Sequence, residues 1–165
     1  MPDNVRPLVR PPIRQDTIVR SDVGHTFDVF VREIGVWWPM TPYSIGQEKV
    51  ATATVEPRLG GRVWETWADG SEVTWGHVIA WDPPRVFGMT WELLPAVTEV
   101  ALRFTALGPA LTRVELEHRG WDRLTSEQFA AASTVAGGYA AGWARVLESL
   151  RSTIEESQRT TVEGD

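Results

Sequence analysis

One change of period constrains this fold more than any other feature of the sequence. Between positions 48 and 119 the side chains alternate with a period of two, and the segments on either side have helical spacing. Turn signals divide the period-two region into six strands. These signals are Gly60-Gly61, Asp69-Gly70, Asp82-Pro83-Pro84, Leu94-Pro95 and Gly108-Pro109. Strands joined by such short turns pair antiparallel, so the sequence predicts one antiparallel sheet flanked by helices.

The six strands are expected at Glu48–Glu56, Arg62–Trp67, Ser71–Trp81, Arg85–Glu92, Val97–Ala106 and Leu111–Arg119. In the last two strands the alternation is clean, with one apolar face and one charged face. The apolar face consists of Val100, Leu102, Phe104, Val114, Leu116 and His118. In the middle strands both faces carry residues that could be covered, so the sequence leaves their buried face open.

The segment before the sheet predicts a strand and then a helix. Ile13–Arg20 is a short extended run, and Ser21-Asp22 supplies N-cap chemistry for the helix that follows. The apolar residues of this helix, at helical spacing, are Val23, Phe27, Phe30 and Ile34. Proline and glycine after the Trp37-Trp38 pair leave room for a second, short helix only.

A long C-terminal helix is predicted after Trp121, where the period returns to 3.6. Its apolar face consists of Phe129, Ser133, Ala136, Ala140, Trp143, Leu147, Leu150 and Ile154. Thr125-x-x-Gln128 has the pattern of a capping box, and Gly137-Gly138 marks either a kink or the true start. The first half of this face is small, so we expect an open cavity between that half and the sheet.

The length of 165 residues favours a single domain, expected over residues 13–154. Residues 1–12, rich in proline and arginine, are expected to form a flexible arm, and residues 155–165 a polar tail. The absence of cysteine excludes disulfides and a thiolate nucleophile, and favours a cytoplasmic location. A formal charge of −6 gives no general attraction to phosphate backbones, so nucleic acid is not an expected partner. No stretch is long and apolar enough for a membrane span.

Short motifs in a fixed order extend from Ile13 to Ile154. They include Phe27-Asp28-Val29-Phe30, Trp37-Trp38-Pro39, Glu56-Pro57-Arg58-Leu59-Gly60-Gly61-Arg62, Trp75-Gly76-His77-Val78, Trp81-Asp82-Pro83-Pro84-Arg85, Arg103-Phe104-Thr105, His118-Arg119-Gly120-Trp121 and Gly142-Trp143. In these motifs and in the order of its elements, the chain resembles the SRPBCC (START-like) superfamily. Within it, the chain is most similar to small homologues of the C-terminal domain of the activator of heat-shock-chaperone ATPase.

The resemblance implies an α+β helix-grip (START-like) fold. In that fold an antiparallel sheet of about seven strands curves around a long C-terminal helix, with one or two short helices after the first strand. The superfamily uses the cavity between sheet and helix for lipids, polyketide-like molecules or other apolar molecules, and in some branches for catalysis. The expected function is therefore the binding of an apolar or amphipathic small molecule, lipid-like or polyketide-like, without a cofactor.

Two alternatives remain beside this expectation. One is a cyclase- or hydratase-type enzyme that acts in the same cavity. The other is an interaction module similar to the chaperone-ATPase activator, which implies a chaperone as partner and a role in the stress response. An exposed edge strand and the Trp37-Trp38 pair also leave a homodimer open.

Nine tryptophans in one small domain make it improbable that all of them serve core packing alone. With the small helix residues and the apolar sheet face, they supply the expected lining of the cavity. The expected lining residues are Trp67, Trp75, Trp91, Leu102, Phe104, His118, Ser133, Ala136, Ala140 and Trp143. For each of these residues, ordinary packing in the core is the alternative.

Three residues are candidates for catalysis. His118 is in register with the apolar face, where it would bond a ligand or act as general acid or base, or instead be a hydrogen-bonded core histidine. His77 and Glu65 lie on adjacent strands, where they would form a cavity acid/base pair or an exposed ion pair. No metal is expected, because the histidines lack ligand spacing and stand on different elements.

Overall fold

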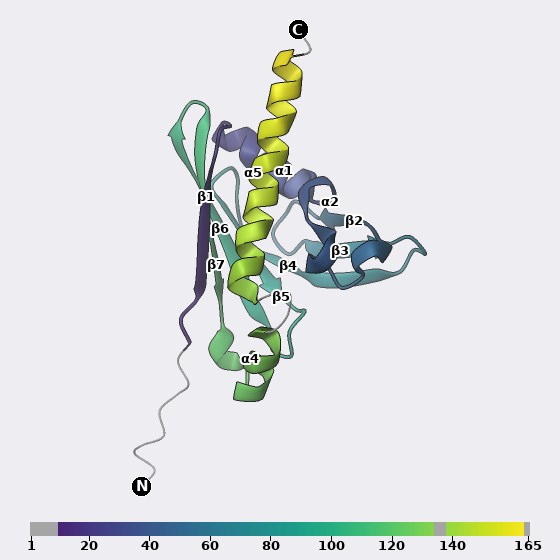
Figure 1. Ribbon diagram of the computed structural model, residues 1–165. Coiled ribbons are helices and arrows are strands. Elements are labelled where there is room, and N and C mark those ends of the chain that lie inside the picture. The colour runs from purple at the N-terminus through teal and green to yellow at the C-terminus, as the bar shows by residue number, and fades with distance from the viewer. Residues whose placement is uncertain (1–9, 134–137, 164–165) are drawn as a thin grey trace.

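The computed structural model describes residues 10–133 and 138–163 (Figure 1). The first described element is strand β1 (Ile13–Val19), followed by the helices α1 (Val23–Arg32), α2 (Ile34–Trp37) and α3 (Met40–Tyr43). The six strands that follow are β2 (Val50–Val55), β3 (Arg62–Trp67), β4 (Glu72–Asp82), β5 (Val86–Trp91), β6 (Thr98–Gly108) and β7 (Leu111–Arg119). Helices α4 (Ser126–Ser133) and α5 (Tyr139–Glu163) complete the described chain. Each predicted strand boundary of the six lies within two residues of the observed one.

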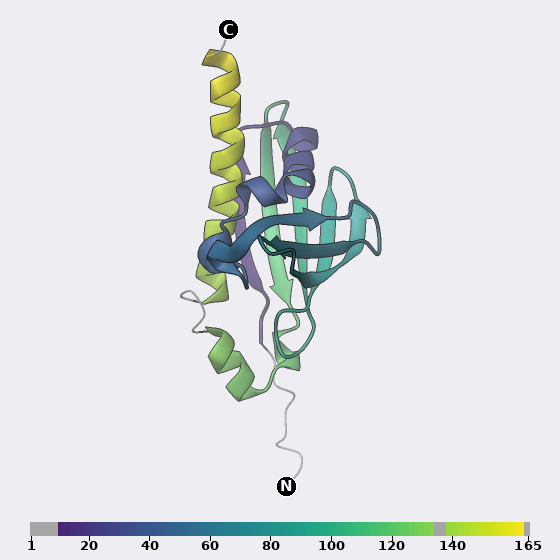
Figure 2. The same ribbon diagram turned by 90° about the vertical axis from the view of Figure 1, so that its right-hand side faces the viewer.

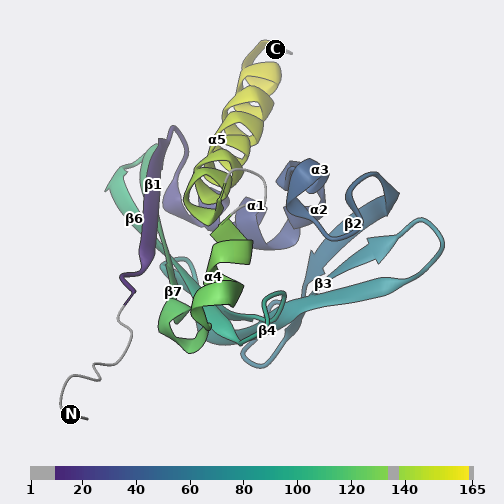
Figure 3. The ribbon, with the colours of Figure 1, turned by 60° about the horizontal axis from the view of Figure 1, so that its bottom comes forward.

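The strands form one seven-stranded antiparallel sheet in the order β1-β7-β6-β5-β4-β3-β2. The first strand of the chain therefore pairs with the last. The sheet curves, and α5 lies against its concave side, as the edge view of Figure 2 shows. Helices α1, α2 and α3 lie on that same side, between α5 and the β2 edge (Figure 3). This is the α+β helix-grip fold that the sequence predicts.

The concave face of β6 and β7 forms the centre of the core. Leu102 lies opposite Leu116 and Phe104 opposite Val114, and all four side chains are buried. The ring of Phe27 on α1 packs edge-on against Phe104, with 5.1 Å between ring centroids. The clean alternation of these two strands thus predicts the buried face correctly.

The middle strands are irregular, which explains why alternation left their buried face open. The β3–β4 register shifts between Val63 and Trp64, and the β4–β5 register shifts after Val78. Such a bulge inserts a residue and changes which face the following side chains occupy. At Gly76 a Cβ atom would lie 1.8 Å from the carbonyl oxygen of Thr90, so only glycine fits where these two strands approach.

The start of each helix follows from its cap. The Oδ1 atom of Asp22 accepts a hydrogen bond of 2.8 Å from the backbone N–H of His25, which confirms the predicted N-cap of α1. The capping box also forms, because Thr125 and Gln128 each accept on the side chain from the other's backbone N–H. It begins the short helix α4, whereas the long helix α5 begins after Gly138, which has a φ of +98°. Of the two starts that the sequence left open, the second is therefore that of the long helix.

Helix α5 is longer than the sequence predicts. It continues to Glu163, so residues 155–163 are helical where a polar tail was expected. Arg151 forms ion pairs with Glu148 and Glu155, which lie one turn away on either side and support an exposed helix of this composition. Among the described residues, no helix is both long and apolar enough to cross a membrane.

Candidate ligand-binding site

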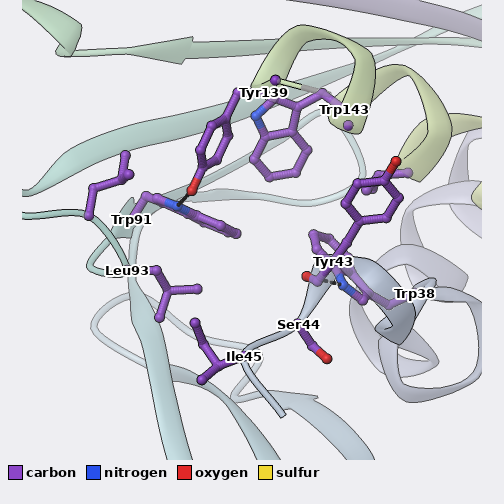
Figure 4. Close-up of a pocket in the computed structure, with 12 residues that line it drawn as sticks. Trp38, Tyr43, Ser44, Ile45, Trp91, Leu93, Tyr139 and Trp143 are labelled. Atoms are coloured by element: carbon purple, nitrogen blue, oxygen red, sulfur yellow. Dashed lines mark hydrogen bonds between the residues drawn. The ribbon is translucent and has the colours of Figure 1, made fainter. Parts of the chain in front are cut away.

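A cavity of about 200 Å³ opens beside the N-terminal part of α5, from Tyr139 to Val146. Its walls come from α5, from the end of β5 and the loop that follows, and from the α2–α3 segment with the residues after it. The lining residues are Trp38, Tyr43, Ser44, Ile45, Trp91, Leu93, Leu94, Gly138, Tyr139, Gly142, Trp143 and Val146. Figure 4 shows Trp91 and Tyr139 on one side of an open centre, and Trp38 and Tyr43 on the other.

The aromatic rings of this pocket form a continuous cluster. The ring centroid of Trp143 lies 5.2 Å from that of Trp91 and 5.9 Å from that of Trp38. Trp38 in turn packs at 4.8 Å on Trp75 in the core below. Edge-to-face and tilted pairs at these distances are favourable beyond the area that they bury. The pocket wall is therefore held in place by the core.

His118 lies behind this wall, fully buried. Its Nδ1 atom accepts a hydrogen bond of 3.0 Å from Nε1 of Trp143, and its Nε2 atom lies 2.7 Å from Oγ1 of Thr98. Because an indole N–H can only donate, Nδ1 is the acceptor and Nε2 carries the proton, which it donates to Thr98. Burial lowers the pKa of His118 to about 3. His118 is thus a neutral, hydrogen-bonded residue that positions Trp143 and does not itself line the pocket.

Glu65 on β3 is also fully buried. Its Oε1 atom accepts from Nε1 of Trp75 at 2.7 Å and from the backbone N–H of Ile45 at 3.1 Å. Its Oε2 atom accepts from Nε1 of Trp67 at 2.7 Å and from the backbone N–H of Gly46 at 2.8 Å. All four partners are donors, so the group serves as an acceptor-only carboxylate. It holds the Ile45–Gly46 segment in place, and Ile45 is part of the pocket wall.

His77 and Glu65 do not form the cavity pair that the sequence offered as a candidate. The strand register places His77 opposite Arg62 and Glu65 opposite Val73. The two side chains also differ in exposure, because His77 is exposed whereas Glu65 is buried. Nδ1 of His77 lies 2.8 Å from Oε2 of Glu92, which makes His77 part of an exposed cross-strand pair with a different residue.

The structure brings together only some of the predicted tryptophan, leucine and phenylalanine lining residues. Trp91 and Trp143 line the pocket. Trp75, Leu102 and Phe104 are buried in the core. Trp67 lies outside the pocket and donates its indole N–H to Glu65.

The small residues predicted on the helix lie elsewhere. Ser133 and Ala140 are exposed, and they border a second hollow, next to β1, with Trp121 and Phe129. Ala136 lies outside the described residues. The predicted face assumed one continuous helix, whereas α5 begins at Tyr139, directly after Gly138 with its φ of +98°. The carbonyl oxygen of Ala140 accepts from the Gln15 side chain, so this part of α5 faces the β1 edge.

Sequence reasoning missed most of the pocket wall. The missed residues are Trp38, Tyr43, Ser44, Ile45, Leu93, Leu94, Gly138, Tyr139, Gly142 and Val146. A usable signal existed at the start of α5, where Gly138, directly before the helix, and Gly142 and Val146 within it are spaced by four. No signal existed for the segment after α3, whose position depends on the buried Glu65.

Comparison with solved structures finds the same fold in proteins from several sources. The anthrahydroquino-gamma-pyrone synthase Txn09 is 31% identical, with a TM-score of 0.56, over 83% of this chain and 97% of that one. The self-sacrificing resistance protein CalC from Micromonospora echinospora is 27% identical, with a TM-score of 0.65, over 89% of this chain and 96% of that one. Protein NE0264 from Nitrosomonas europaea is 12% identical, with a TM-score of 0.65, over 90% and 97%, and shares the fold.

Comparison with curated proteins finds no match. A family model does match, and its description is Activator of Hsp90 ATPase homolog 1-like protein. It covers residues 27–155, which includes the greater part of α1, the strands from β2 to β7 and most of α5. The motifs, the fold and this match agree: the chain belongs to the Activator of Hsp90 ATPase homolog 1-like family of the START-like superfamily.

Proposed function

We propose that the protein binds an apolar or amphipathic small molecule with flat aromatic rings, similar to an aromatic polyketide, between the curved sheet and α5. One observation carries this proposal: five aromatic side chains surround an open cavity whose other lining residues are mostly apolar. Ligand pockets in proteins have this composition, with a few polar groups that fix orientation. The similar protein Txn09, which is named as an anthrahydroquino-gamma-pyrone synthase, adds support.

The size of the cavity refines the kind of ligand. Pockets for drug-sized ligands have volumes of about 300–1,000 Å³, and this cavity measures about 200 Å³. It therefore suits one end of such a molecule, with the remainder extending past Ile45 and Leu93. The Ile45 side chain is 54% exposed although it lines the pocket, which places it at the mouth. A molecule with one flat apolar end and one solvated end fits this arrangement.

Replacing Ile45 by tryptophan tests the proposal. The larger side chain fills the mouth without entering the core, so we expect the affinity for the aromatic probe 8-anilinonaphthalene-1-sulfonate to fall about tenfold, or about 1.4 kcal/mol. Titration followed by probe fluorescence measures this change. The matched control is Val36→Trp, which introduces the same side chain at a 71% exposed apolar residue outside the pocket. This control is expected to keep the wild-type affinity.

Equal loss of affinity in both variants, or in neither, would contradict binding at this pocket. If the wild-type protein bound no probe and instead stimulated the ATPase of an Hsp90 chaperone, the interaction-module alternative would replace the proposal. Probe binding and ATPase stimulation are measured on the same protein preparations.

A second candidate function is catalysis in the same pocket, which the 31% identity to a synthase favours. The lining residues include two groups that can exchange a proton, the phenols of Tyr43 and Tyr139. His118 and Glu65 are enclosed behind the wall by their hydrogen bonds. Incubating an identified ligand with the protein separates the two functions by chromatography: a binder returns the ligand unchanged, whereas an enzyme converts it into a new compound.

A further inference from the structure

Most side-chain donors around the pocket already donate to the protein. Nε1 of Trp38 donates to the carbonyl oxygen of Tyr43 at 3.1 Å, and Nε1 of Trp143 donates to His118. The Ser44 hydroxyl donates to the carbonyl oxygen of Met40 at 2.6 Å. These groups have no hydrogen left for a ligand. They contribute shape and apolar surface to the pocket.

Tyr139 differs from them. Its hydroxyl oxygen accepts a hydrogen bond of 3.3 Å from Nε1 of Trp91, which can only donate. The hydrogen of the Tyr139 hydroxyl is therefore not used in this contact, and within residues 10–133 and 138–163 it has no acceptor. In Figure 4 this hydroxyl meets the Trp91 nitrogen at the side of the open centre, across from Tyr43.

The second phenol of the lining is placed differently. The hydroxyl of Tyr43 lies 3.4 Å from Nη1 of Arg145, on the exposed surface of α5. In Figure 4 it points away from the open centre, toward α5. Tyr139 is thus the lining side chain whose unused donor is available inside the pocket.

We propose that the ligand is recognised through a carbonyl oxygen that accepts a hydrogen bond from the Tyr139 hydroxyl, which makes it a flat aromatic ketone or quinone. This inference rests on the proposed function, since it specifies the ligand of the same pocket. A neutral acceptor is the appropriate chemistry because the lining contains no Asp, Glu, Lys or Arg side chain. A carboxylate in this position would lose its hydration without gaining a cation.

Two features make the Tyr139 hydroxyl an effective donor. Donation from Trp91 to its oxygen polarises the O–H bond, as happens in chains of hydrogen bonds. Burial raises the pKa of Tyr139 above its ordinary value of 10, so the hydroxyl keeps its proton at neutral and mildly alkaline pH. The pocket thus presents one fixed donor within an aromatic wall.

The experiment compares 9-fluorenone with fluorene, two flat molecules of the same shape that differ in the carbonyl group. Dissociation constants are measured by quenching of tryptophan fluorescence. Since one hydrogen bond contributes a modest net amount, we expect the wild-type protein to prefer the ketone by about 2- to 12-fold. In Tyr139→Phe this preference is expected to disappear, while the affinity for fluorene changes less than about twofold. Val36→Trp, the control outside the pocket, is expected to keep the preference.

The outcomes separate this inference from the proposed function. Equal affinity of the wild-type protein for both molecules, or a preference that survives in Tyr139→Phe, overturns the inference and leaves the pocket assignment standing. Failure of the wild-type protein to bind either molecule overturns the proposed function as well. A measurement on the wild-type protein alone keeps the test valid if Tyr139→Phe does not fold. The infrared carbonyl stretch of bound fluorenone is expected at lower wavenumber than in an apolar solvent, because the carbonyl oxygen accepts a hydrogen bond. An unshifted stretch overturns the inference.

Discussion

Replacing Glu65 by glutamine is expected to destabilise the protein strongly. Each carboxylate oxygen of Glu65 accepts one hydrogen bond from an indole N–H and one from a backbone N–H. In whichever orientation the glutamine amide lies, its NH2 group therefore faces two of these donors. Two enclosed donors then lack a partner, at about 1–3 kcal/mol each, which amounts to about 2–6 kcal/mol of unfolding free energy. In a domain of this size the melting temperature falls by about 5–20 °C. Thermal and urea unfolding measure the change.

The matched control for this prediction is Glu72→Gln. Glu72 lies on the neighbouring strand β4 and forms an ion pair of 2.9 Å with Arg62 at the surface. Exposed pairs contribute little, so this variant is expected to change the unfolding free energy by less than about 1 kcal/mol. If the two variants were equally stable, Glu65 would not be the anchor that we describe. A stable Glu65→Gln protein with unaltered probe binding would likewise show that the Ile45–Gly46 segment holds its place without this residue.

Acid is expected to destabilise the protein through His118, well above the pH at which carboxylates titrate. The pKa of His118 is lowered to about 3 in the folded protein by burial, whereas an unfolded chain has the ordinary value of 6.5. Between these values the unfolded state binds one proton more, so the contribution of His118 to stability is complete above pH 6.5 and is lost as the pH falls. The expected slope is about 1.4 kcal/mol per pH unit, or a loss of about 2 kcal/mol between pH 7 and pH 5.

Urea unfolding of wild type and His118→Gln at pH 7, 6 and 5 measures this slope. The variant has no imidazole at this position, so its unfolding free energy is expected to depend less on pH, whatever its absolute stability. His25→Gln removes an exposed imidazole and serves as the matched control. Identical slopes in wild type and His118→Gln would contradict the prediction. Protonation of His118 at Nδ1 would also place one N–H donor against another, that of Trp143 Nε1, and so remove the hydrogen bond that positions Trp143 in the pocket wall. Probe binding is therefore expected to weaken in acid.

The fold was predictable because its elements carry local signals. Alternation in β6 and β7, the turns between strands and the caps of α1 and α4 each depend on residues that are neighbours in sequence or across a single turn. The resemblance to a known superfamily then supplied the arrangement of the sheet around the helix. Where a bulge interrupts a strand, as after Val63 and Val78, this local information is lost.

The pocket was predictable only in part, for a physical reason. Trp91 and Trp143 were expected because alternation along a strand and spacing along a helix made each a candidate for the cavity lining. Trp38 and Ile45 line the pocket because long-range hydrogen bonds and ring contacts hold an irregular segment in place, with Glu65 at its centre. The direction in which each α5 side chain points depends on where this helix begins, which is directly after Gly138. From the sequence alone, Gly137-Gly138 could be either this start or a kink within a longer helix.

The central claim is that the pocket at the N-terminal half of α5 holds a small molecule. Native mass spectrometry of the protein as purified, with extraction and identification of whatever is released, tests this most directly. The expected result is one flat, aromatic, carbonyl-bearing adduct per chain, present in wild type and Val36→Trp and reduced in Ile45→Trp. If all three proteins had the mass of the bare chain, and the wild type took up nothing from a panel of aromatic ketones, quinones and lipids, the claim would be contradicted.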